Sequence, residues 1–191
     1  MHEAKTGTAL PPRYLPGDLP PDREVARMVR VDHAGEYGAA RIYQGQLAVL
    51  GKRDCAPLLR HMAAQEQRHL ESFDKMLTAR RVRPSALSPL WHAAGYALGA
   101  GTALLGEKAA MACTVAVEEV IDAHYAAQHD RLTARGDEPE LAAMIEEFRQ
   151  EEAEHRDLGL AHGAEAAPGY SLLKTLISAG ARLAIRVAER V

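Results

Sequence analysis

Apolar residues recur at every third or fourth position along four long segments of the chain, a spacing typical of amphipathic helices. The segments run over about 22–51, 54–83, 107–133 and 138–162. Asp22 follows a proline and is expected to cap the first of them. Since no segment shows the alternation of a strand, the pattern predicts an all-α helix bundle.

Two further segments are predicted to be helical. Residues 84–106 contain no Asp, Glu, Lys or Arg, which favours a helix at a membrane interface over a bilayer span. A buried helical hairpin is the alternative. A last helix is predicted after Pro168 and Gly169, with leucines on one side and basic residues elsewhere. Such a helix can dock on the bundle or lie on an anionic membrane.

The composition fits one globular domain. The chain has 191 residues, 47% hydrophobic and 26% charged, and its net charge of −3 argues against a dedicated nucleic-acid binder. Five of the ten prolines lie in residues 1–21, which predicts a disordered Pro-rich tail before a domain over 22–191. The two cysteines lie in no C-x-x-C pair, so neither a disulfide framework nor a zinc knuckle is indicated. The N-terminus lacks the apolar core of a signal peptide.

Two Glu-x-x-His motifs suggest metal chemistry, Glu66 with His69 and Glu152 with His155. On a helix, residues three apart share a face, so a carboxylate and an imidazole can bind one ion together. With this many Glu and His residues, about one such motif is expected by chance. The two motifs are therefore weak evidence by themselves.

The positions of two other glutamates strengthen the case. Glu36 precedes Glu66 by thirty residues, and Glu118 precedes Glu152 by thirty-four. Each lone glutamate is followed seven residues later by a tyrosine, as in a duplicated helix pair. This is the ligand order of di-metal bundles. It predicts a ferritin-like antiparallel four-helix bundle, with additional helices between the two helix pairs and at the C-terminus.

All four glutamates lie on apolar stripes, where a lone carboxylate is costly unless it is paired or bound to metal. Four negative charges balance two divalent ions, and carboxylate with imidazole suits iron or manganese. Glu118 is preferred to Glu119 because it shares its helix face with Met111 and Tyr125. The competing interpretation is a bundle whose Glu and His side chains merely face solvent.

Polar residues near the lone glutamates are candidates for hydrogen bonds to the ligands, although an ordinary polar contact explains each of them equally well. These candidates are Tyr125, His124, Asp32, His33 and Asp122. Glu151 and Glu154 do not stand three residues before His155, so they are expected to face solvent or to support a ligand from outside.

Longer stretches of the chain resemble a known family, the demethoxyubiquinone hydroxylases of ubiquinone biosynthesis. Residues 31–39, VDHAGEYGA, are similar to the signature of its first helix, and residues 112–119, ACTVAVEE, to that of its third. Residues 151–155, EEAEH, and the tail 172–190 are also similar, so the resemblance covers about 22–191. The iron ligands that it implies are Glu36, Glu66, His69, Glu118, Glu152 and His155.

The resemblance also implies a reaction, the O₂-dependent hydroxylation of a polyprenyl methoxy-benzoquinol ring (demethoxyubiquinol) by a di-iron monooxygenase. It requires two iron ions per chain and electrons from outside the chain, supplied by a nicotinamide cofactor such as NADH or through the quinol itself. The sequence has no dinucleotide fingerprint. Because a polyprenyl tail stays in the bilayer, a peripheral protein on the cytoplasmic face of the inner membrane is expected. Its further partners are other ubiquinone-biosynthesis proteins or a second copy of the chain.

Two other functions compete with this interpretation. A ferritin-like ferroxidase or iron-storage bundle would assemble into a cage, but it leaves the uncharged residues 84–106 unexplained. A non-catalytic membrane scaffold is the other, and the intact set of six ligand residues argues against it. The spacing of the ligands does not separate iron from manganese.

Overall fold

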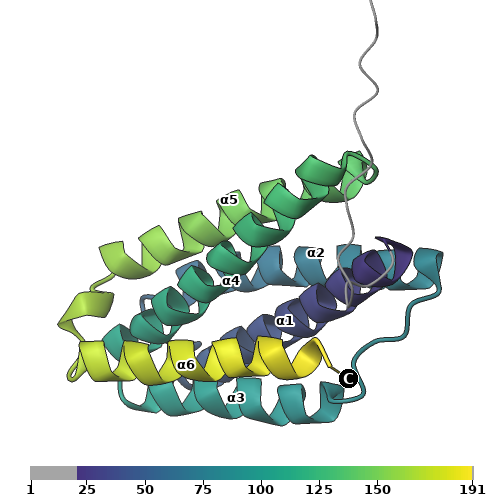
Figure 1. Cartoon of the computed structure of the whole chain (residues 1–191). Helices are drawn as coiled ribbons and strands as arrows, with labels where there is room; N and C mark the ends of the chain where they lie inside the picture. Colours follow the sequence, from purple (N-terminus) through teal and green to yellow (C-terminus); the bar gives the residue numbers. More distant parts are fainter. Residues whose placement is uncertain (1–20, 191) are drawn as a thin grey trace, which may run out of the picture.

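The four long helices form two antiparallel pairs, as the apolar pattern predicts (Figure 1). The computed structural model describes residues 21–190, so the predicted disordered tail lies almost wholly outside the described residues. The first pair is α1 (Pro21–Leu50) with α2 (Ala56–Arg80), and the second is α4 (Glu107–Arg135) with α5 (Pro139–Ala161). No strand occurs among the described residues, and the prediction of an all-α, ferritin-like bundle is confirmed.

The helix ends follow from local chemistry. Residues in the left-handed conformation stop α2 at Arg81, with φ 53°, and α4 at Gly136, with φ 70°. The amide of Gly136 then donates to the carbonyl of Leu132 at 2.9 Å, which satisfies an otherwise free helix carbonyl. The prediction that Asp22 caps α1 is wrong, because the helix already begins at Pro21 and Asp22 lies in its first turn.

Helix α3 (Ser88–Leu104) connects the two pairs and packs along α1. The contact needs glycine, because a Cβ built on Gly99 would lie 1.9 Å from the carbonyl oxygen of Ile42. One on Gly45 would lie 2.3 Å from the carbonyl oxygen of Tyr96. The alternative of a buried hairpin over 84–106 is wrong, since these residues form one helix with an exposed side.

Helix α6 (Tyr170–Ala188) follows a short 3₁₀ turn, η1 (Ala164–Ala166), and packs on α4. The hydroxyl of Ser178 donates to the carbonyl of Ala116 at 3.1 Å. Both α6 and α3 lie on the same side of the bundle (Figure 1). Leucines on both helices are exposed there, and none of the described helices is long and apolar enough to cross a membrane.

Replacing Gly99 with alanine is expected to lower the free energy of unfolding by about 1–3 kcal/mol, because the new Cβ must push α3 away from α1. This corresponds to roughly 2–4 °C in Tm per kcal/mol. The control is Gly101→Ala on the same helix, where a Cβ would meet nothing within 4 Å. Thermal unfolding followed by circular dichroism measures both variants, and equal Tm values for the two would contradict the prediction.

Candidate metal centre

Each long helix contributes to one buried cluster of carboxylates and imidazoles. Helix α1 brings Glu36 and α4 brings Glu118, whereas α2 and α5 each bring a Glu-x-x-His motif. None of these side chains is more than 1% exposed. The structure therefore brings together all six residues that the sequence singles out, namely Glu36, Glu66, His69, Glu118, Glu152 and His155.

The cluster divides into two groups of four side chains, and within each group one ligand atom per residue lies within 4.8 Å of the others. Glu66 and Glu152 belong to both groups. The first group, called position A here, is completed by Glu36 and His69, and the second, position B, by Glu118 and His155. Two shared carboxylates between two positions are the arrangement expected for bridging ligands.

Both imidazoles turn the same nitrogen toward the cluster. The Nδ1 atom of His69 lies 3.1 Å from Glu152 Oε1 and 3.3 Å from Glu36 Oε2. The Nδ1 atom of His155 lies 3.1 Å from both Glu66 Oε1 and Glu152 Oε2. The outer nitrogens are thus free to bind supporting groups.

The two tyrosines cross between the helix pairs. The hydroxyl of Tyr43 donates to Glu118 Oε1 at 2.9 Å, and that of Tyr125 donates to Glu36 Oε1. Each lone glutamate therefore keeps its second oxygen for other contacts. His124 does not support a ligand in this way, because its Nε2 lies 3.1 Å from Asp32 Oδ1.

The other candidates from the sequence contact different partners. His33 binds Asp74 at 2.9 Å, and Asp122 pairs with Arg149 at 3.1 Å, so neither touches the cluster. Glu119 lies outside it and pairs with Lys174 at 2.6 Å. Glu118 therefore lies inside the cluster and Glu119 outside it.

Two residues support the histidines from outside the cluster: Glu151, for which the sequence left this role open beside exposure to solvent, and Gln65, which was not predicted from the sequence. The outer nitrogen of His69 lies 2.6 Å from Glu151 Oε2, and that of His155 lies 3.0 Å from Gln65 Oε1. Each partner precedes the Glu-x-x-His motif of the opposite helix pair. No spacing rule within one helix could have found these contacts, because they join residues on α2 to residues on α5.

Burial and mutual repulsion perturb the carboxyl groups strongly. Burial raises the pKa of Glu66 to about 8, with a further contribution from the charge of Glu152, and it holds the pKa of Glu118 well above its usual range. Burial also opposes ionisation of Glu152, but hydrogen bonds from both histidines outweigh it and lower its pKa to about 2. At neutral pH the metal-free cluster therefore holds protons that a metal ion would displace.

Several buried polar atoms in the cluster make no well-aligned hydrogen bond, although imidazole–carboxylate pairs bring some of them within 3.1–3.3 Å of each other. They include both carboxylate oxygens of Glu66 and the Nδ1 atom of His69, and one oxygen each of Glu36, Glu118 and Glu152. Such atoms are costly unless something binds them. A set of carboxylate oxygens with two imidazole nitrogens suits iron or manganese, so the residues fit a pair of divalent ions.

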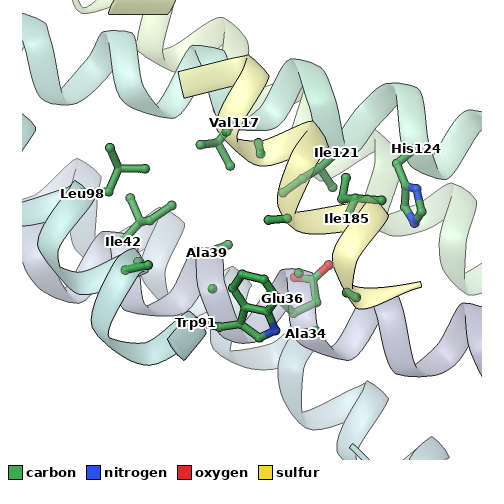
Figure 2. A pocket seen from close by; sticks show the side chains of 18 of the residues that line it. Ala34, Glu36, Ala39, Ile42, Trp91, Leu98, Val117, Ile121, His124 and Ile185 are labelled. Carbon is green, nitrogen blue, oxygen red and sulfur yellow. The ribbon is translucent and has the colours of Figure 1, made fainter. Parts of the chain in front are cut away.

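A cavity of about 510 Å³ opens beside the cluster, between α3 and α6. Figure 2 shows the carboxylate of Glu36 among its apolar side chains, with Trp91 from α3 and Ile185 from α6. Glu36 and Tyr125 line the cavity, whereas Glu118 does not. Position A is thus the one next to this space.

Residues 23–188 match the sequence model of one protein family, described as ubiquinone biosynthesis protein COQ7. The chain belongs to this family. It is 61% identical to the 3-demethoxyubiquinol 3-hydroxylase of Rhodospirillum rubrum, over 93% of this chain and 83% of that protein. It is 54% identical to the NADPH-dependent 3-demethoxyubiquinone 3-hydroxylase of Homo sapiens, over 87% of this chain and 78% of that protein. The corresponding identity with the 5-demethoxyubiquinone hydroxylase of Saccharomyces cerevisiae is 42%, over 86% and 77%.

Replacing Glu152 with glutamine is expected to weaken the binding of both ions, because this residue belongs to both positions. Glu36→Gln should weaken the binding of only one ion. Each affected binding affinity should fall at least about tenfold, because removing even a group that only supports a ligand has an effect of this size. Anaerobic Fe(II) titration of the metal-free protein measures the number of ions bound. Glu154→Gln, at an exposed position of the same helix as Glu152, serves as the control. Loss of both ions in Glu36→Gln would contradict the two-position arrangement.

Proposed function

We propose that this protein hydroxylates the ring of demethoxyubiquinol, a polyprenyl methoxy-benzoquinol, with O₂ as co-substrate. The observation that carries the proposal is the mostly apolar cavity lined by Glu36, because it joins a space for an aromatic ring to the buried cluster. The names of the relatives support the same reaction. An iron-storage bundle has no use for such a cavity.

Two iron ions are proposed to bind at positions A and B. Glu66 and Glu152 would be shared between them, and each position would add one lone glutamate and one histidine, Glu36 with His69 and Glu118 with His155. Bound iron would supply the redox chemistry that O₂ requires. The protein keeps bulk water away from the cluster, since every ligand is buried, and Tyr43 and Tyr125 fix the lone glutamates.

The volume of about 510 Å³ and the mostly apolar lining of the cavity suit a quinol ring with part of an isoprenoid tail. Its polar side chains gather near Glu36, where Asp32, His124 and Tyr125 also line it. Gly35 and Gly180 line it as well, and a Cβ on either would meet nothing within 4 Å. These glycines are therefore not required by packing, and they leave room for a bound molecule.

The electrons are proposed to come from a reduced nicotinamide nucleotide, NADH or NADPH. Relatives from several eukaryotes carry the description NADPH-dependent. The sequence offers no dinucleotide fingerprint for a dedicated Rossmann-type site.

The side of the bundle with α3 and α6 is proposed to lie on a membrane. Exposed leucines lie on both helices, with Leu104 75% and Leu176 62% exposed, and Leu176 also lines the cavity. A substrate whose tail stays in the bilayer could enter between the two helices without leaving the lipid. Association with the cytoplasmic face of the inner membrane, with other ubiquinone-biosynthesis proteins or with a second copy of the chain stays a prediction.

Deleting the gene in a ubiquinone-producing host is expected to cause accumulation of the demethoxy precursor, because the ring would no longer be hydroxylated. Quinone profiling by mass spectrometry measures it, and the wild-type gene should restore ubiquinone. A normal quinone profile in the deletion strain would overturn the proposed function.

In purified protein, Gly180→Leu should lower kcat/KM for the quinol by at least about tenfold while the iron content stays unchanged, because the leucine side chain would fill part of the cavity. Gly101→Leu, outside the cavity, is the matched control.

Replacing Leu104 and Leu105 together with glutamate is expected to reduce sedimentation with anionic liposomes by at least about tenfold, because each leucine contributes about 1.5–3 kcal/mol when buried. The control is Leu160→Glu on α5, where the leucine is also exposed but lies away from the cavity. Equal sedimentation of the double variant and the wild type would contradict the proposed membrane side.

A further inference from the structure

The two metal positions are built alike from a duplicated pattern. Each has a lone glutamate that accepts a tyrosine hydroxyl, and each has a histidine that turns Nδ1 inward. Both share the same two glutamates, Glu66 and Glu152, which would lie between the two ions. Any difference in affinity between the positions must therefore come mainly from groups outside the ligands.

The partners of the outer histidine nitrogens provide such a difference. Gln65 and Glu151 occupy the same place in the two motifs, directly before Glu66 and Glu152, and each reaches the histidine of the other motif. His155 thus meets a neutral amide oxygen at 3.0 Å, whereas His69 meets a carboxylate at 2.6 Å. The duplicated motifs differ at this place by one residue.

Arg68 holds the carboxylate of Glu151 in place. Its guanidinium binds both oxygens of Glu151 with Nη2 and Glu147 Oε1 with Nη1, the latter at 3.1 Å. Arg68 is 46% exposed and Glu151 only 20%, so the arginine covers the carboxylate from the solvent side. Glu147 binds the same guanidinium but does not contact His69, so Glu151 alone places a carboxylate oxygen against the ring.

A carboxylate that accepts the outer N–H of a metal-binding imidazole fixes the ring and its tautomer and makes the inner nitrogen a stronger ligand. Removing such a partner typically lowers metal affinity 10–100-fold. A neutral amide has a weaker effect, because it carries no charge.

We infer that Glu151, held by Arg68, is a positioning residue for His69 and makes position A the tighter metal position of the two. This inference rests on the metal centre proposed above. The position next to the cavity is then the first to fill and the last to empty. Glu151 itself touches neither metal nor substrate in this role.

Stepwise titration of the metal-free protein with Co²⁺, followed by the visible absorption of the bound ion and by calorimetry, tests the inference. Wild-type protein should show two resolved steps, and Glu36→Gln should abolish the tighter one. Glu151→Gln keeps the shape of the side chain and should weaken the tighter step about 10–100-fold, so that the two steps merge. Glu147→Gln removes the charge of another carboxylate that binds Arg68. Because Glu147 does not contact His69, this variant should still show two steps.

The reciprocal exchange guards against a mere loss of folding. Gln65→Glu should strengthen the weaker step, and the double variant Gln65→Glu with Glu151→Gln should strengthen position B relative to A. Unchanged steps in Glu151→Gln, or equal weakening of both, would overturn the inference while leaving the two-metal centre intact. Wild-type protein that binds fewer than two Co²⁺ ions would overturn the metal centre itself.

Discussion

Four buried carboxylates face one another at the centre of the bundle, and their repulsion is the constraint that the surrounding structure must satisfy. Two inward imidazoles and two tyrosine hydroxyls provide part of the compensation. Each of the four carboxylates still has an oxygen without a well-aligned hydrogen bond, which leaves the compensation incomplete without bound cations. The four long helices are positioned so that these groups meet within a few ångströms, and the apolar residues around them keep water out.

The additional helices determine how the centre can be reached. Glycines let α3 approach α1 closely, and a serine anchors α6 to α4, so both helices are held firmly on one side of the bundle. The space between them is neither filled by side chains nor closed to the outside, and Glu36 lines it. Membership in the COQ7 family and this geometry support the same substrate class, a quinol.

Most of the architecture and the residues of the cluster could be predicted because they depend on local rules. The 3.6-residue period reveals the four helices, and the spacing of three within Glu66–His69 and Glu152–His155 places each pair on one face. The contacts of Glu151 with His69 and of Gln65 with His155 could not be predicted, because they depend on how α2 and α5 are set against each other. The fit of α3 against α1 likewise depends on backbone contacts that no apolar pattern reports.

The crossed tyrosines bear on how such a chain could arise. Tyr43 of the first helix pair serves Glu118 of the second, and Tyr125 of the second serves Glu36 of the first. One helix pair alone therefore lacks the hydroxyl for its own glutamate, whereas two copies related by a two-fold axis supply both, as in a self-complementary dimer. An ancestor with a single pair could have built the centre only as a dimer. Fusion of the two copies then frees each half to change separately, as the different residues at positions 65 and 151 illustrate.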